Sequence, residues 1–185
     1  MKAQYLRNIA LTASVAVALL CPISAVAATD MFLKLTGING ESRDNAHANE
    51  IDVLAWSWGE SNGTALTKKG LVPTACIQDL SLTKYIDAAS PELIMRTING
   101  QVIVDAKLTV RKAGATPLEY LVLSMTNVTV KSYATGGSGG EDRLTENISL
   151  RFGRMVGTYK KQDATGAVTG TVLWDIAGTN SAGCQ

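Results

Sequence analysis

Residues 51–58 carry the clearest strand pattern of the chain, a period of two in which larger and smaller side chains alternate from Val53 to Trp58. Successive side chains of a β-strand point to opposite faces, so this segment has a bulky face and a small-sided face. The bulky face carries Leu54, Trp56 and Trp58, and the small-sided face carries Val53, Ala55 and Ser57. We expect the bulky face to lie in a core and the small-sided face to allow close approach of another surface.

Further β-prone segments follow at short intervals, separated by turns rich in glycine and asparagine. They cover residues 31–36, 76–85, 102–112, 119–133, 144–161 and 167–176. Gly153 and Gly157 fall inside one long segment, where we expect it to bend. The pattern predicts about seven strands in a mainly β fold, an antiparallel two-sheet β-barrel or sandwich.

One segment has the signals of a short helix. Ser90 suits the N-cap, Pro91 suits the first helical position, and Asn99-Gly100 suits the end of the helix. The apolar stripe that we expect to face the core consists of Leu93, Ile94 and Ile98. The fold is therefore predicted to contain one helix of two to three turns.

The connection at residues 59–74 is long for a compact domain. It contains three glycines and a proline, and we expect a loop there. Loops of this length are uncommon unless they are mobile or functional.

The first residues have the order of a secretory signal peptide. Lys2 and Arg7 precede an apolar run at residues 9–20, and the small residues Ala25-Val26-Ala27 follow. The run is shorter than the ~20 residues that a membrane-spanning helix needs. We expect residues 1–28 to be a signal peptide and residues 29–185 a single domain; an N-terminal membrane anchor is the alternative.

The charge balance excludes some partners. The formal net charge is +1, and cleavage after Ala27 would remove Lys2 and Arg7 and leave about −1. Neither value supports electrostatic binding to nucleic acid or to an anionic membrane. We expect the one basic cluster, Lys107, Arg111 and Lys112, to lie on a solvated strand face.

Two cysteines, Cys76 and Cys184, remain after such a cleavage. An exported compartment would permit a disulfide between them. The alternative is two unrelated thiols, one in a strand and one on a frayed C-terminus. The sequence leaves both open.

No residue pattern indicates catalysis. His47 is the single histidine and lies in a polar loop near Asp44 and Glu50, so we expect it to be a hydrogen-bonding loop residue. Ser138 matches the G-x-S-x-G pattern formally, but a β-prone stretch follows where a nucleophile elbow needs a helix. A hydrolase using His47 and Ser138 is therefore a weak hypothesis, and we expect no catalytic residue, metal or cofactor.

Several strings of the chain resemble one known family. They are DMFLK at 30–34, GES at 40–42, EIDVLAWSWG at 50–59, QDLSLTKY at 78–85, AKLTVRKAG at 106–114 and GGSGGEDRLTEN at 136–147. Together they are similar to hemolysin-coregulated protein (Hcp), the tube subunit of the bacterial type VI secretion system. The likeness runs from about Asp30 to Ile176.

The resemblance implies a two-sheet β-barrel with one helix, six copies of which form a ring. Rings stack into a hollow tube inside a contractile sheath, and small effectors can travel in its lumen. The implied partners are other copies of the chain, spike and sheath components, and effector cargo. The family has no catalytic residues.

The resemblance also suggests where these contacts lie. The connection at 59–74 corresponds to the family's extended loop, which reaches the adjacent ring. Its candidate contact residues are Gly59, Gly63, Leu66, Lys68 and Lys69. Ser57 is the candidate for a position that faces the lumen and its cargo.

The signal-like segment departs from the family, whose typical members lack one because the tube is built in the cytoplasm. Three explanations are open: translation starts near Met31, the segment is retained, or the chain is an exported paralogue that forms rings without the firing machinery. The protein would then be secreted, with assembly in the cytoplasm or the periplasm. The alternative function is an exported β-sandwich binding module, an adhesin or carbohydrate binder, which would need exposed tryptophans.

Overall fold

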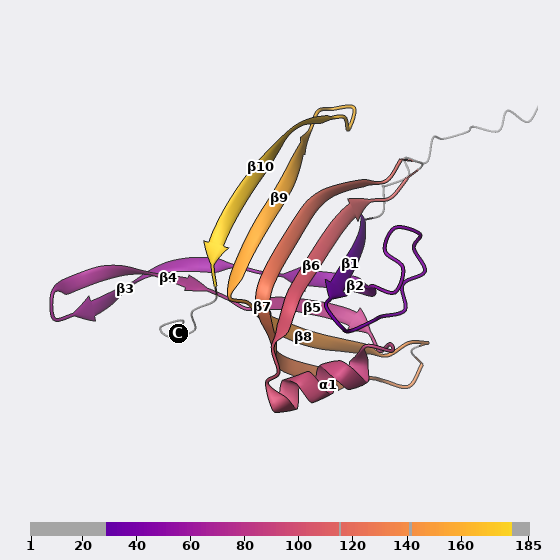
Figure 1. The fold of residues 1–185 in the computed structure, drawn as a ribbon, viewed down its shortest axis with the longest axis horizontal. Helices are drawn as coiled ribbons and strands as arrows, with labels where there is room; N and C mark the ends of the chain where they lie inside the picture. The colour runs from indigo at the N-terminus through magenta and orange to yellow at the C-terminus, as the bar shows by residue number, and fades with distance from the viewer. Residues whose placement is uncertain (1–28, 115, 141, 179–185) are drawn as a thin grey trace, which may run out of the picture.

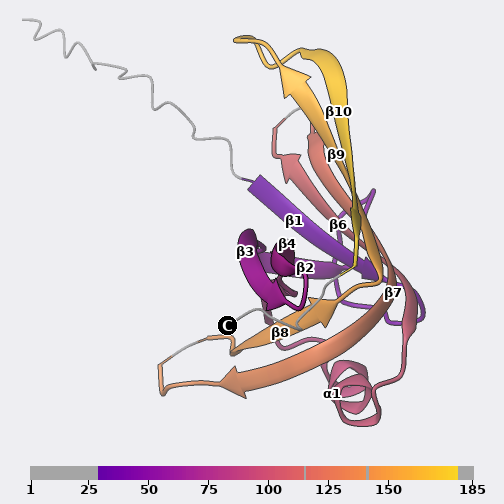
Figure 2. The same cartoon turned by 90° about the vertical axis from the view of Figure 1, so that its left-hand side faces the viewer.

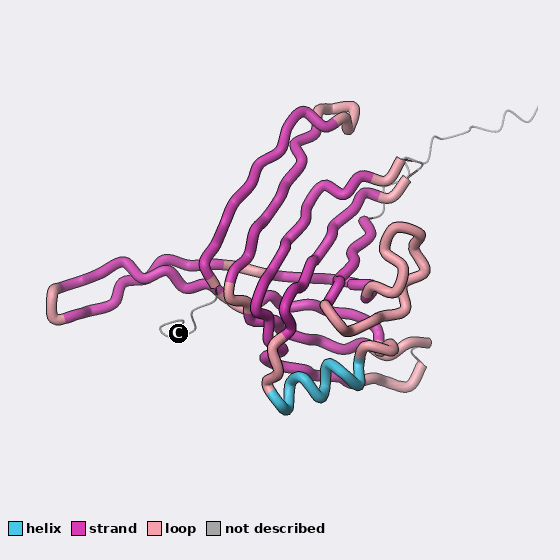
Figure 3. Tube along the Cα trace, in the orientation of Figure 1, coloured by secondary structure: helices cyan, strands magenta, loops and turns pink. Residues whose placement is uncertain are grey.

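The computed structural model describes residues 29–114, 116–140 and 142–178, where the chain forms ten strands and one helix (Figures 1 and 3). The signal peptide expected at 1–28 and Cys184 lie outside these residues. The elements are β1 Thr29–Leu35, β2 Ile51–Ser57, β3 Glu60–Thr67, β4 Gly70–Ile77, β5 Leu80–Tyr85, α1 Ser90–Asn99, β6 Ile103–Lys112, β7 Leu118–Gly136, β8 Thr145–Arg151, β9 Arg154–Gln162 and β10 Val168–Ala177.

Six strands close into an antiparallel barrel in the order β7, β6, β1, β2, β5 and β8, with β8 pairing back onto β7. Closure depends on the length of β7, which has 19 residues and pairs with different strands along its course. Its first part lies between β6 and β9, and its second part pairs with β8. The structure therefore confirms the predicted mainly β barrel with one short helix.

The predicted long strand at 144–161 is divided into β8 and β9 at Gly153, as expected. The Gly153 N–H donates to the Thr126 carbonyl at 2.9 Å, and Asn127 opposite it has a left-handed φ of 52°. A β-carbon on Gly153 would lie only 3.1 Å from Cβ of Asn127. The close approach lets the chain leave one sheet and enter the other. Gly157, the second expected bend, lies inside β9 without breaking it.

Beyond the barrel, β9 and β10 widen the sheet that contains β6 and β1. In Figure 2 this sheet stands upright, while β8 and the far half of β7 run below it. β10 pairs with β9 along its length, with one irregularity between Val168 and Gly170.

β2 changes the face that it turns to the core. Ile51 and Val53 are buried, the register then slips between Val53 and Ala55, and Trp56 packs against the core after the slip. Because an extra residue in a strand shifts the alternation by one position, the predicted face assignment is wrong for the first half of the strand. Leu54, expected in the core, is 39% exposed.

The helix α1 packs against β7. Leu93 is fully buried, but Ile94 and Ile98 are 38% and 74% exposed, so most of the predicted stripe does not face the core. Ser90 is the first helical residue rather than the N-cap, which is Ala89. The predicted end is confirmed, because Gly100 adopts a left-handed φ of 65° and its N–H donates to the Arg96 carbonyl.

Candidate functional site

The segment expected to be a loop at 59–74 is a two-stranded β-ribbon, β3 and β4, which we call the arm (Figure 1). The arm follows the β2–β5 pair along the chain: Ser57 pairs with Ser81, and the first pair of the arm is Glu60 with Ile77, three residues further along one strand and four along the other. The expected loop is wrong, because both strands of an isolated ribbon are edge strands, in which glycine and proline are tolerated.

The junction between barrel and arm is held by polar contacts. The Trp58 indole N–H donates to the Gln78 carbonyl at 3.0 Å, and the Gln78 N–H donates to the Gly59 carbonyl at 3.1 Å. Trp58 is partly buried and packs against the core. The arm is therefore anchored to the barrel wall.

The five candidate contact residues are spread along the arm. Gly59 lies at its base, Gly63 pairs with Thr74 in mid-ribbon, and Leu66 pairs with Leu71 near the tip. Lys68 and Lys69 form the turn, and both are exposed. The structure thus brings these positions onto one projecting element.

A row of four serines crosses the barrel wall next to the arm. Ser57 pairs with Ser81, Ser81 with Ser149, and Ser149 with Ser132, so one serine comes from each of β2, β5, β8 and β7. Strands in a sheet are about 4.8 Å apart, so the row presents hydroxyl groups at close, regular intervals. The hydroxyls of Ser132 and Ser149 are 2.5 Å apart.

The serine row lines a shallow groove of about 300 Å³. Thr83 and Asn147 stand beside it, and the Thr83 hydroxyl donates to Asn147 Oδ1 at 2.7 Å. All lining residues are uncharged: Ala55, Trp56, Ser57, Ser81, Leu82, Thr83, Ser132, Asn147, Ile148 and Ser149. The face suits hydrogen bonding to a neutral surface. Sequence reasoning found Ser57 and missed the other serines, although Ser81 and Ser149 each lie between two apolar residues of a strand.

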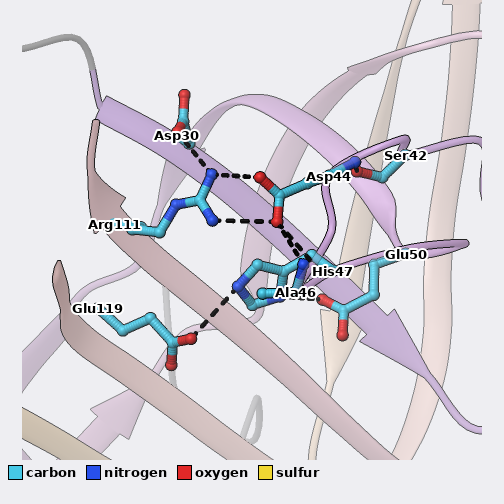
Figure 4. Close-up of polar contacts among 8 residues, drawn as sticks. All are labelled: Asp30, Ser42, Asp44, Ala46, His47, Glu50, Arg111 and Glu119. Atoms are coloured by element: carbon cyan, nitrogen blue, oxygen red, sulfur yellow. Dashed lines mark hydrogen bonds and ion pairs between the residues drawn. The ribbon is translucent and has the colours of Figure 1, made fainter. Parts of the chain in front are cut away.

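A charged cluster holds the loop between β1 and β2 against the barrel (Figure 4). The Arg111 guanidinium donates to Asp44 on that loop at 2.5 and 3.0 Å and to Asp30 at 2.9 Å. The hydrogen bond from Arg111 lowers the pKa of Asp44 to about 2, against its usual 3.8. Arg111 is 8% exposed, so the predicted solvated face is wrong for this residue, whereas Lys112 is exposed and Lys107 is half-buried.

His47 completes this cluster. Its Nδ1 lies 2.9 Å from Glu50 Oε2, and its Nε2 lies 3.4 Å from Glu119 Oε1 (Figure 4). The ring stacks on Phe32 with centroids 4.2 Å apart, and it is 3% exposed. This is the hydrogen-bonding loop histidine that the sequence predicted, and it braces the loop.

A second buried cluster ties β5, β8 and the start of α1 together. Lys84 is fully buried, and its Nζ lies 2.6 Å from Glu146, 2.7 Å from Asp87 and 3.3 Å from the Ser90 hydroxyl. The Tyr133 hydroxyl donates to Glu146 at 2.6 Å. Burial, and to a smaller extent the Glu146 carboxylate, raises the pKa of Tyr133 to about 12, so the hydroxyl keeps its proton. The cluster fixes the barrel wall behind the serine row.

Cys76, near the end of β4 where the arm joins the barrel, forms a disulfide. Because Cys184 lies outside the described residues, the pairing of these two cysteines stays a prediction.

Within the described ranges no three His, Cys, Asp or Glu side chains are grouped so that they could hold a metal ion. The same ranges contain no helix of the length and apolarity that a membrane span requires.

Comparison with known proteins decides the family. Residues 32–159 match the family described as "Type VI secretion system effector, Hcp". The chain belongs to the Hcp family. It is 49% identical to the protein Hcp1 of Pseudomonas aeruginosa over 155 residues, which cover 80% of this chain and 96% of the relative.

Solved structures agree. A type VI secretion system effector from Yersinia pestis shares 35% identity at a TM-score of 0.67, with 80% of this chain and 99% of that chain covered. Hcp1 from Salmonella typhimurium shares 34% identity at a TM-score of 0.65, with coverage of 81% and 94%. The expected Hcp tube subunit of a type VI secretion system is confirmed, and the exported binding module is not favoured.

Proposed function

We propose that this Hcp subunit works through three surfaces rather than through an active site. Ring-forming faces join six copies, the arm reaches the adjacent ring, and the serine row faces the lumen. The single observation that carries the proposal is the position of the serine row: three of its serines are exposed and Ser149 is half-buried, its groove is uncharged, and it is continuous through β2 and β5 with the arm. Spike and sheath components and effector cargo are the proposed partners.

The serine row suits a lumen wall that lets cargo move. Serine side chains are short, and hydroxyls offer both donors and acceptors. A cargo held by such groups is bound weakly at each point, because the net contribution of a neutral hydrogen bond is only about 0.5–1.5 kcal/mol. Charged lumen walls would hold oppositely charged cargo more strongly and repel the rest. Ser57 keeps its predicted role as one member of this row.

The proposed site of assembly is the cytoplasm, with secretion of the assembled tube. If the signal-like segment at residues 1–28 is used instead, assembly takes place after export, and a disulfide at Cys76 is then favoured by the compartment. N-terminal sequencing of the native protein from each cell fraction separates these routes.

Gold labelling of rings tests the lumen assignment. We expect Ser149→Cys, coupled to a maleimide gold cluster, to show density inside the ring in top views by negative-stain microscopy. Ala164→Cys, in the exposed turn between β9 and β10, is the matched control, and its gold density is expected at a different radius in the ring.

Light scattering of the unlabelled protein first establishes the hexamer. Gold on the outer rim for Ser149→Cys would contradict the assignment, and a wild-type protein that stays monomeric would contradict the function.

A further inference from the structure

The strand β10 has an open edge. It pairs with β9 on one side, and within the described residues it has no strand on the other. Most of its ten residues are exposed, and Leu173 is 66% exposed. An open edge presents a row of backbone N–H and C=O groups to any chain that can pair with it.

This edge lacks the usual protection. Exposed edge strands in natural proteins carry lysine, proline or bulges, or they are covered by another element. Residues 171–176 of β10, TVLWDI, contain neither lysine nor proline, and the register irregularity lies earlier, at Val168 to Gly170. The one charge, Asp175, is bound by Arg154 of β9. The edge is therefore suited to pairing with another strand.

The arm supplies a second open edge. β3 and β4 pair with each other and with no other described strand, and of these two edges only β4 contains a proline, which has no N–H to donate, so β3 is the better edge for pairing. A two-stranded ribbon is only marginally stable alone in water, so an arm of this kind gains from a further strand. β3 has eight residues and β10 has ten, so the two can pair over nearly their whole length.

We propose that the β3 edge of the arm adds to the β10 edge of a second copy in the adjacent ring, so that one sheet continues across the ring boundary. The inference rests on the proposed function and names the receiving surface of the arm. Pairing β3 with β10 joins two different surfaces. Each ring then offers its β3 edges to the ring on one side and its β10 edges to the ring on the other side, so stacking can continue. Pairing β10 with β10 would be self-complementary and would stop at two rings.

Two variants remove one edge each. In the first, an Asn-Gly turn replaces residues 61–76, which shortens the arm and keeps the β2–β5 pair. Cys76→Ser controls for the disulfide lost with that segment. In the second, proline replaces Val172 or Leu173, to remove an N–H from the outer edge of β10 while keeping its pairing with β9. Of two adjacent strand residues, only one points its N–H away from β9, so both proline variants are made. The variant whose circular dichroism shows a folded subunit is then used.

Amide hydrogen exchange and mixing decide the question. In concentrated wild-type rings we expect the outward amides of β10 to exchange more slowly than in rings with the shortened arm, by a factor of roughly ten or more.

Each variant alone should form single rings, and an equal mixture should form stacks of two rings but no longer stacks. Equal β10 exchange in both proteins, or continued stacking of either variant alone, overturns the inference and leaves the ring-forming function standing. Absence of rings from the wild type contradicts the proposed function itself.

Discussion

Lys84 and Glu146 face each other across β5 and β8, with 2.6 Å between Nζ and Oε1, and both side chains are fully buried. Taking two charges out of water is unfavourable unless each finds partners, and here Asp87 and the Tyr133 hydroxyl supply them. The pair therefore fixes the relative position of the two strands that carry Ser81 and Ser149.

Removing one partner of this pair should be strongly destabilising. We expect Glu146→Ala to lower the free energy of unfolding by about 3–5 kcal/mol, because Lys84 is left buried with less compensation. Urea unfolding followed by tryptophan fluorescence measures the change. Asp175→Ala breaks the exposed pair with Arg154 and is expected to leave the unfolding midpoint nearly unchanged. Similar midpoints for the two variants would contradict the buried role of Glu146.

Lowering the pH should weaken the contact of Asp44 with Arg111, which holds the loop that carries His47. The pKa of Asp44 is about 2 in the folded protein and ordinarily 3.8, so the folded state favours its carboxylate. A group of this kind stabilises the fold above its unfolded pKa, and the contribution disappears as pH falls from about 4 towards 2. The stability difference between wild type and Asp44→Asn should therefore be constant near neutral pH and shrink over that acid range. A difference that is independent of pH would show that the Asp44 carboxylate does not titrate in this way.

The register slip in β2 makes neighbouring positions unequal. Trp56 packs against the core after the slip, so we expect Trp56→Ala to cost about 2–3 kcal/mol, less than for a fully buried tryptophan. Leu54→Ala, at an exposed position two residues earlier, should change stability by no more than about 1 kcal/mol. Chemical denaturation of both variants measures this. The opposite ranking would mean that the strand keeps its first alternation throughout.

The pairing of β10 with β9 depends on a glycine under a tryptophan. A β-carbon on Gly157 would overlap the indole ring of Trp174, its cross-strand partner. We expect Gly157→Ala to destabilise the subunit by about 1–3 kcal/mol through overpacking. At Gly170, on β10, a β-carbon would meet nothing within 4 Å, so Gly170→Ala should stay within about 0.5 kcal/mol of wild type. Thermal unfolding of the pair provides the measurement, and equal effects would argue against a close Trp174 contact.

The sequence predicts this fold well wherever local pattern decides the structure. The divided strand at 144–161, the left-handed Gly100 and the mainly β class follow from residue types at fixed spacing. The exchange of faces in β2 does not, because Val53 and Leu54 are both apolar and only pairing with β5 shows which one is inside.

The candidate site was harder to predict because it is built across strands. Ser57 lies on an alternating strand and could be singled out, but the row with Ser81, Ser149 and Ser132 depends on strand order and register. The arm was hidden for a similar reason. Its two strands have weak local signals, and they form a ribbon only by pairing with each other directly beyond β2 and β5.

The strands of the arm follow directly from β2 and lead directly into β5, two strands of the barrel wall. A force on the tip of the arm is therefore transmitted to the wall through the polypeptide backbone. In the proposed contact with the adjacent ring, a hinged loop would let that ring rotate about the attachment point, whereas a ribbon that continues from β2 and β5 would resist the rotation. The proposed contact would then hold each added ring at a set angle to the one beneath it, and the straightness of a long column would follow from the stiffness of a single hairpin.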